Sequence, residues 1–107
     1  MTTVFEQSAR PVPVDFSSIE DEWRSEGFSF GVFRDPPGQE WNDFTHQSDE
    51  YLLVAEGQLE IEVGDQTRIC EPGDLVRIPR LVRHSLKTLS PDGSVWLYGY
   101  GFWDLAR

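Results

Sequence analysis

Hydrophobic and polar residues alternate along the chain in short segments, and turn-forming residues separate these segments. The clearest example is residues 58–63, where three apolar side chains alternate with two glutamates, a pattern typical of a strand with one buried face. The Gly64-Asp65 pair that follows suits a tight hairpin turn, because glycine tolerates the positive φ that such turns require. The pattern therefore predicts a β-hairpin whose second strand is residues 66–70.

Other apolar runs of strand length are separated by clusters of proline, glycine and aspartate. They lie at residues 28–33, 51–55, 75–78, 82–88 and 95–102. Pro79 interrupts the ladder between two of these runs, because proline lacks the N–H that a strand donates. Many short strands with frequent turns are typical of an all-β sandwich or barrel, and this is the predicted fold class.

Residues 51–55 differ from the other runs because they are apolar on both alternating faces. Such a strand is expected to be covered on both sides. The protein core would supply one cover and a second subunit the other. The pattern therefore predicts a homodimer.

The last run carries aromatic side chains at alternate positions. They are Trp96, Tyr98, Tyr100 and Phe102. Such a row belongs more often to a core or a subunit contact than to a wall that stacks on a ligand, and we favour the former. Gly99 and Gly101 lie on the opposite face, where they indicate a bulge or the close approach of a neighbouring backbone.

Outside the strands, residues 17–23 predict a helix of at most two turns, because Ser17 and Glu20 have the spacing of a capping box. Residues 1–14 are predicted to form an N-terminal arm or an edge strand. The whole chain, residues 1–107, has the length of one domain.

The chain is strongly acidic, with 19 acidic and 9 basic residues and a net charge of -10. Long-range repulsion disfavours nucleic acid and anionic lipid as partners, so a small molecule is the expected ligand. No apolar run approaches the roughly 20 residues that cross a bilayer. The single cysteine, Cys70, cannot form an internal disulfide, and the N-terminal residues lack the pattern of a secretory signal. A cytoplasmic location is therefore expected.

Two histidines, His46 and His84, are the candidates for metal ligation or acid–base chemistry. Glu50 follows His46 by four residues, which along a straight strand is about 13 Å and too far for two side chains to share an ion. A helix, or a sharp turn over residues 47–49, would bring the two side chains together. The turn is favoured, because it contains serine and aspartate.

The spacing around these residues resembles the two motifs of the cupin superfamily. The first motif is a glycine, five residues, His-x-His, three or four residues, a glutamate, six residues and a glycine, and its spacing is matched by GQEWNDFTHQSDEYLLVAEG, residues 38–57. The second motif is a glycine, five residues, Pro-x-Gly, two residues, a histidine, three residues and an asparagine. GDLVRIPRLVRHSLKT, residues 73–88, meets it at Gly73, Pro79 and His84. The resemblance covers about half the chain and implies a small single-domain cupin with an all-β, double-stranded β-helix (jelly-roll) barrel.

Three motif positions depart from the cupin pattern. Phe44 replaces the first histidine, Leu81 the glycine of Pro-x-Gly, and Thr88 the asparagine. The resemblance leaves His46, Glu50 and His84 as ligands of one divalent metal ion in the barrel mouth. Such a set of two histidines and one carboxylate suits iron, zinc, manganese or nickel.

Trp41 and Phe44 directly precede the ligand positions and are the candidates for walls of a substrate pocket. An apolar Phe44 would dry the site and strengthen its electrostatics, whereas the loss of one imidazole would lower the affinity for metal. No residue is assigned a catalytic role. Arg83 is expected to face solvent, because adjacent strand residues point to opposite faces. For Arg80 two roles stay open: balancing the acidic charge of the surface, or capture of a carboxylate substrate.

Three functions stay open. The first is a metal-dependent small-molecule enzyme, with an oxygenase as one form of it. The second is a non-catalytic module that binds or senses a small ligand. The third is a metal-independent isomerase or epimerase that uses His84 or Glu50 as an acid or base. A fold that hosts many functions does not choose among them.

Overall fold

The computed structural model describes residues 3–105, which form nine β-strands, one α-helix and a terminal 3-10 turn. In chain order the elements are β1 (Phe5–Glu6), α1 (Phe16–Ser25), β2 (Gly31–Asp35), β3 (Glu40–Phe44), β4 (Asp49–Glu56), β5 (Leu59–Val63), β6 (Gln66–Cys70), β7 (Leu75–Ile78), β8 (His84–Thr88), β9 (Ser94–Gly101) and η1 (Trp103–Leu105).

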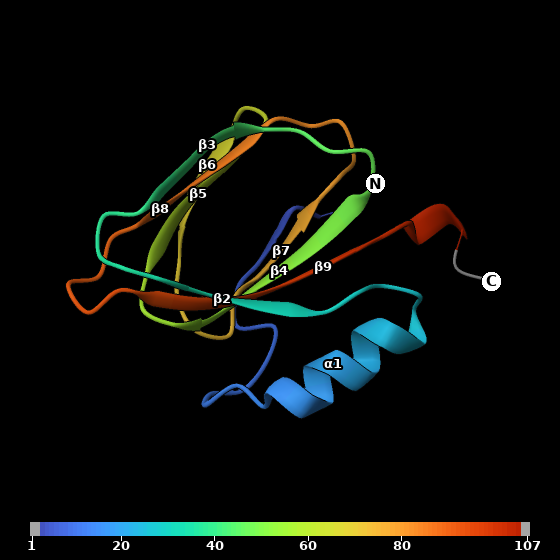
Figure 1. Cartoon of the computed structure of the whole chain (residues 1–107), viewed down its shortest axis with the longest axis horizontal. Helices are drawn as coiled ribbons and strands as arrows, with labels where there is room; N and C mark the ends of the chain where they lie inside the picture. Colours follow the sequence, from blue (N-terminus) through green and yellow to red (C-terminus); the bar gives the residue numbers. More distant parts are fainter. Residues whose placement is uncertain (1–2, 106–107) are drawn as a thin grey trace.

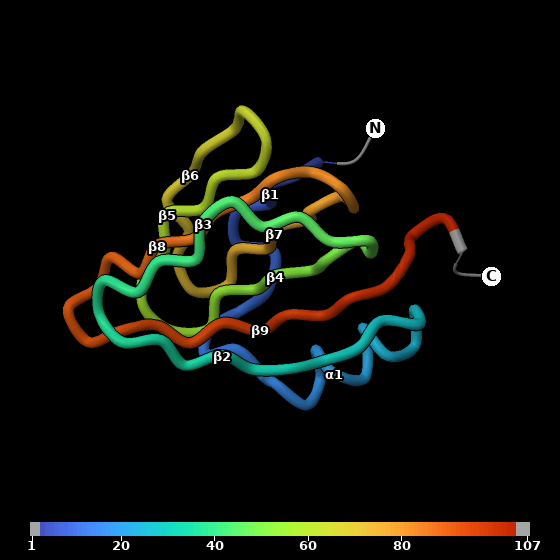
Figure 2. The backbone as a smooth tube through the Cα atoms, turned by 45° about the horizontal axis from the view of Figure 1, so that its top comes forward, coloured from blue at the N-terminus to red at the C-terminus, as the bar shows by residue number. Residues whose placement is uncertain are grey.

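The strands form two antiparallel sheets. One sheet has five strands in the order β1-β7-β4-β9-β2, which Figure 2 shows from one side of the molecule to the other, and the second has the order β3-β8-β5-β6. Strands distant in sequence lie side by side, so that β4 pairs with β7 and β9, and β5 pairs with β8. The all-β jelly-roll barrel predicted from the sequence is confirmed.

The space between the sheets is filled by apolar side chains that alternate along the strands. On β5, Leu59, Ile61 and Val63 face this core and are at most 3% exposed. The predicted hairpin is also confirmed, because β5 pairs with β6 from Val63 opposite Gln66 at the turn to Leu59 opposite Cys70.

Helix α1 covers the outer face of the five-stranded sheet, away from the barrel interior (Figure 1). Its buried residues Ile19 and Trp23 pack against Tyr51 and Leu53 of β4, while the alternate positions of β4 face the barrel core. The second cover predicted for residues 51–55 is therefore supplied by the same chain. Burial of β4 gives no reason to expect a dimer, and dimerisation stays a prediction.

The helix differs from its sequence prediction in length and in its cap. It has ten residues, and the carboxylate of Asp15 caps it by accepting a hydrogen bond from the N–H of Ser18. The predicted capping box of Ser17 and Glu20 is wrong, because the chain enters the helix two residues earlier than that motif requires.

Three strand assignments also differ from the prediction. Residues 28–30 stay outside β2, because the N–H of Phe28 bonds to the carbonyl of Trp23 and closes the helix. Strand β8 begins at His84 rather than at residue 82. Strand β3 was missed, because it lies at the edge of its sheet and is largely exposed, so its residues lack a clear alternation.

Strand β9 runs close to the chain segment that follows α1. A Cβ atom at Gly99 would meet the carbonyl oxygen of Ser29, and one at Gly101 would meet the ring of Phe28. The predicted close approach of a backbone is confirmed at Gly99, whereas at Gly101 the close neighbour is a side-chain ring. These close approaches let β9 lie beneath the aromatic residues that cover the sheet.

At the N-terminus, β1 is the edge strand of the five-stranded sheet and pairs with β7. Residues 1, 2, 106 and 107, which the predicted domain of residues 1–107 includes, lie outside the described residues, so the extent of the domain stays a prediction. Within residues 3–105, no helix has both the length and the apolar composition that crossing a membrane requires.

Candidate metal centre

One end of the barrel brings together the first residues of β4, the first residue of β8 and the loop that joins β3 to β4. Alternation along β4 places Glu50 on the barrel face in step with Leu52, and alternation along β8 places His84 in step with Leu86. His46 lies in the loop and reaches the same space. The structure therefore brings together all three residues that the motif spacing selected.

The chain bends at residues 47 and 48 immediately before β4. As a result, Nε2 of His46 lies 2.9 Å from Oε1 of Glu50, whereas a straight strand would separate the two residues by about 13 Å. The predicted turn is confirmed, and the alternative of a helix is wrong.

The third side chain approaches the same carboxylate oxygen. Nε2 of His84 lies 3.6 Å from Oε1 of Glu50, and one ligand atom from each of the three residues lies within 4.8 Å of the others. Atoms bound to one ion at about 2.0–2.2 Å lie about 3–3.5 Å apart, which is close to both measured separations. The cluster of His46, Glu50 and His84, hereafter the triad, could therefore hold a metal ion.

Backbone carbonyls orient both imidazoles of the triad. Nδ1 of His46 lies 2.8 Å from the carbonyl oxygen of Ser48, and Nδ1 of His84 lies 3.1 Å from that of Val82. A carbonyl only accepts hydrogen bonds, so each Nδ1 carries the hydrogen and donates it. In the neutral imidazole this leaves Nε2 as the lone-pair atom, and in both rings Nε2 is the atom that faces Glu50.

The surroundings shift the pKa values of the two histidines in opposite directions. The hydrogen bond to Glu50 raises the pKa of His46, whose side chain is 23% exposed. Burial lowers the pKa of His84, whose side chain is 4% exposed. The surroundings thus favour the protonated form of His46 and the neutral form of His84.

Asp49 holds the ligand turn in place. Its buried carboxylate accepts hydrogen bonds from the backbone N–H of Arg80 at 2.8 Å, from the guanidinium of Arg80 at 3.3 Å and from the backbone N–H of Trp103 at 3.0 Å. Arg80 also forms an ion pair with Asp104, so its positive charge is paired with the carboxylates of Asp49 and Asp104. Arg80 does not line the cavity beside the triad. Arg83, with a side chain 61% exposed, faces solvent as predicted.

A cavity of about 180 Å³ adjoins the triad. Its other lining residues are aromatic or aliphatic: Phe33, Trp41, Phe44, Leu86, Trp96 and Tyr100. The predicted wall residues Trp41 and Phe44 do lie there. Trp96 packs in the barrel core and also lines the cavity, and Tyr100 lines it with its ring 4.9 Å from that of His46. The aromatic row of β9 is thus partly core, as favoured from the sequence, and partly pocket wall.

Asp35 holds the indole rings of two cavity-lining residues, Trp41 and Trp96, in place. Its carboxylate is 8% exposed, and Oδ2 accepts hydrogen bonds from the indole N–H groups of both Trp41 and Trp96, each at 2.9 Å. Sequence reasoning missed Asp35, which stands in a turn-forming cluster with two prolines and a glycine. It also missed Asp49 as an anchor, since aspartate in a turn is ordinary.

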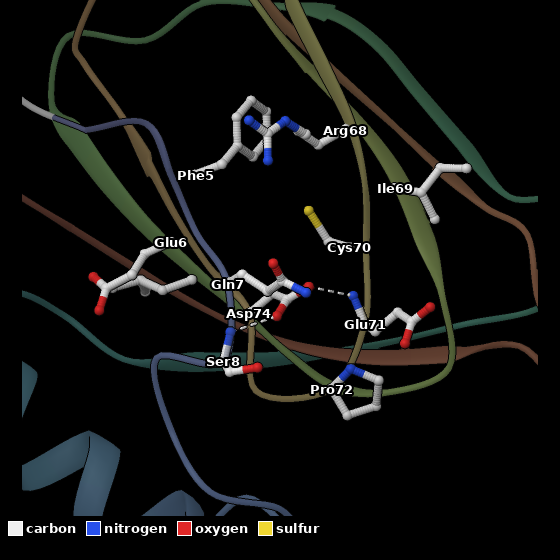
Figure 3. A pocket seen from close by; sticks show the side chains of 11 residues that line it. Phe5, Glu6, Gln7, Ser8, Arg68, Ile69, Cys70, Glu71, Pro72 and Asp74 are labelled. Carbon is white, nitrogen blue, oxygen red and sulfur yellow. Dashed lines mark hydrogen bonds between the residues drawn. The ribbon is translucent and has the colours of Figure 1, made fainter.

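A second and larger hollow, of about 310 Å³, lies beside β1 and β6 (Figure 3). Cys70 lines it, but burial raises the pKa of this thiol to about 12, so the reactive thiolate is absent near neutral pH. Asp74, also in this hollow, accepts the N–H groups of Ser8 and Glu71. Within residues 3–105, the triad is the one group of three or more acidic, histidine or cysteine side chains placed to hold an ion.

Comparison with known proteins agrees with this geometry. A family model described as "Cupin domain" matches residues 31–100, which include the whole triad. The chain belongs to the cupin family. A search of curated proteins found no match for this cupin.

Solved structures of other proteins share the fold. The cupin domain of Schizosaccharomyces pombe Cnp3 has a TM-score of 0.67 at 20% identity, with 70% of this chain and 52% of that chain covered. AerE from Microcystis aeruginosa has a TM-score of 0.65 at 18% identity, with 68% and 35% covered. An RmlC-like cupin from Shewanella frigidimarina has a TM-score of 0.63 at 19% identity, with 68% and 64% covered. This chain thus matches about half of the first protein and about a third of the second.

Proposed function

We propose that this cupin binds one divalent first-row metal ion through His46, Glu50 and His84 and acts on a small molecule in the adjoining cavity. The observation that carries the proposal is the orientation of the triad. Both imidazoles commit Nδ1 to a backbone carbonyl and turn Nε2 toward the same carboxylate oxygen. Donors arranged in this way fit a metal ion, and iron, zinc, manganese and nickel all accept this donor set.

The reaction class that best fits the donor set is oxidation of the small molecule by oxygen. A site of two histidines and one carboxylate on one face of Fe(II) leaves positions open for substrate and oxygen. The residues of the chain then have distinct tasks. With the ion bound, Glu50 would supply the negative charge, His46 and His84 would supply neutral donors, and the aromatic walls would give the substrate an apolar surface.

Metal content tests the first part of the proposal. Purified protein is loaded separately with iron, zinc, manganese and nickel, passed through gel filtration, and analysed for metal per chain. We expect about one ion per chain for at least one metal, and loss of that ion in His46→Ala. Equal, metal-free results for the two proteins would contradict the proposal.

Oxygen consumption tests the second part. Anaerobic loading with Fe(II), followed by addition of oxygen and of a panel of diketones, catechols and thiols, should give turnover with one of these substrates. A metal-loaded protein that shifts in melting temperature with a ligand but consumes no oxygen would instead be a binding module.

A second candidate function rests on the hydrogen bond between His46 and Glu50. A histidine and a carboxylate 2.9 Å apart at the end of a cavity can pass a proton to and from a substrate without a metal ion. This would make the protein an isomerase or epimerase. Turnover by chelator-treated protein that His46→Ala and Glu50→Gln abolish would support this candidate over the metal centre.

A further inference from the structure

We infer that the cavity beside the triad takes a small aromatic molecule with a single negative charge, of which an aromatic monocarboxylate is the simplest case. This ligand class rests on the proposed metal centre and specifies what that centre acts on. Three properties of the cavity select it: its volume, the nature of its walls and its charge.

The volume limits the ligand to one ring. The cavity holds about 180 Å³, while pockets for drug-sized molecules hold about 300–1,000 Å³. An apolar cavity of about 150 Å³ is sufficient for benzene. The space beside the triad therefore fits a single six-membered ring with a small substituent.

The walls favour a ring that is flat and aromatic. Phe33 is central to them, with its ring centroid 5.7 Å from that of Trp41 and 4.8 Å from that of Trp96. The ring centroids of Phe44 and Trp41 are 6.0 Å apart. The ring of Tyr100 lines the part of the cavity nearest His46. Aromatic side chains prefer offset or edge contacts with another ring, which adds to the gain from burial.

Asp35 removes the hydrogen-bond donors from these walls. Because one oxygen of its carboxylate accepts the N–H groups of both Trp41 and Trp96, neither indole has a hydrogen left for a ligand. Outside the triad, the remaining polar side chain in the lining is Tyr100. A sugar or other polyol would leave its hydroxyls unpaired here, which disfavours such ligands.

Charge selects an anion. Among residues 3–105, Glu50 is the one carboxylate in the cavity lining, and no lysine or arginine lines it. A divalent ion held by Glu50 and two neutral histidines would therefore keep one net positive charge. An unbalanced charge in a dry pocket is costly, and one negative charge on the ligand removes that cost. Aromatic walls also attract cations, but a cation here would lie beside the net positive charge of the centre.

Titration of the zinc-loaded protein tests the ligand class. Zinc per chain is measured first, and tryptophan fluorescence is then followed during addition of benzoate, benzyl alcohol, acetate or benzylammonium. We expect benzoate to bind once per chain and about tenfold more tightly than the other three, because only benzoate combines an aromatic ring with a negative charge. Equal binding of benzyl alcohol, acetate or benzylammonium would overturn the ligand class.

A pair of variants assigns the binding to this cavity. Phe44→Ala removes a wall that is already 43% exposed, and we expect it to raise the Kd for benzoate by about two- to tenfold. Ile69→Ala, at a side chain 56% exposed and outside the cavity, should leave that Kd unchanged. An unchanged Kd in Phe44→Ala would overturn the assignment.

The zinc measurement separates the two proposals. Protein that holds zinc but does not bind benzoate would refute the ligand class and leave the metal centre standing. Protein that holds no zinc is titrated in the same way with whichever of iron, manganese or nickel it holds, and protein that holds none of the four metals would refute both proposals.

Discussion

Phe44 of β3 and His84 of β8 are direct partners across the sheet, with their ring centroids 6.4 Å apart. Phe44 occupies the position at which the cupin motif has its first histidine. An apolar ring therefore stands beside the triad where a further imidazole ligand would stand in the motif. This relationship leads to the first prediction.

Replacement of Phe44 by histidine should restore a fourth protein ligand. We expect Phe44→His to bind zinc about tenfold or more tightly than the natural sequence, because zinc is most often held by four ligands. Competition with a chromophoric chelator measures the change. Phe44→Leu is the matched control and should give no gain. Zinc affinity in Phe44→His equal to that of the control would show that residue 44 does not reach the ion.

Removal of the charge at Asp49 should loosen the ligand turn. An asparagine at this position would keep one acceptor oxygen but lose the charge-assisted bonds to Arg80 and the backbone of Trp103. We expect Asp49→Asn to lower the free energy of unfolding of the metal-free protein by about 1–3 kcal/mol, measured by urea unfolding. Asp43→Asn is the control, since Asp43 is 69% exposed and lies 3.6 Å from Arg83, and its effect should stay within about 0.5 kcal/mol. Equal effects would mean that Asp49 is not an anchor.

Leu81 holds a strained backbone conformation in the loop before β8. Its φ is +67°, its side chain is 63% exposed, and its N–H donates to the carbonyl of His46. Glycine adopts this conformation without strain, so Leu81→Gly should leave the stability unchanged or raise it by up to about 1 kcal/mol. Leu89→Gly, at an exposed leucine without positive φ, should instead be destabilising. Thermal unfolding measures the stability of both variants relative to the unchanged protein, and a marked loss of stability in Leu81→Gly would refute the prediction.

Cys70 should make the protein less stable at high pH. Burial raises the pKa of its thiol from 9.0 to about 12, so between these values the unfolded chain loses the proton and the folded chain keeps it. The free energy of unfolding should therefore be fully retained below about pH 9 and fall above it, by up to about 1.4 kcal/mol per pH unit from this group. Urea unfolding at pH 8, 9.5 and 11 measures the decline, which should be shallower in Cys70→Ala. Native protein should also resist iodoacetamide at pH 8, and rapid alkylation would contradict the burial.

Much of the fold could be predicted, because the barrel strands follow simple alternation. Residues 58–70 carry both the apolar pattern and the turn of a hairpin, and the structure has that hairpin. Strand β3 could not be predicted in this way. It is an edge strand with little buried surface, so its place depends on pairing with β8 and not on its own pattern.

The triad could be selected from the sequence because motif spacing encodes the turn before Glu50. The supporting residues could not. Asp35 and Trp96 are 61 residues apart, and Asp49 and Trp103 are 54 apart, so these contacts exist only once the sheets have assembled. The cover over β4 could not be predicted for the same reason, since nothing in residues 51–55 distinguishes a helix of the same chain from a second subunit.

X-ray absorption at the zinc edge of the zinc-loaded protein tests the metal centre most directly. We predict a first shell of nitrogen and oxygen ligands at about 2.0–2.1 Å, with outer-shell scattering from two imidazoles and no sulfur. A spectrum with sulfur ligands or without imidazole scattering would contradict the assignment of the ion to His46, Glu50 and His84.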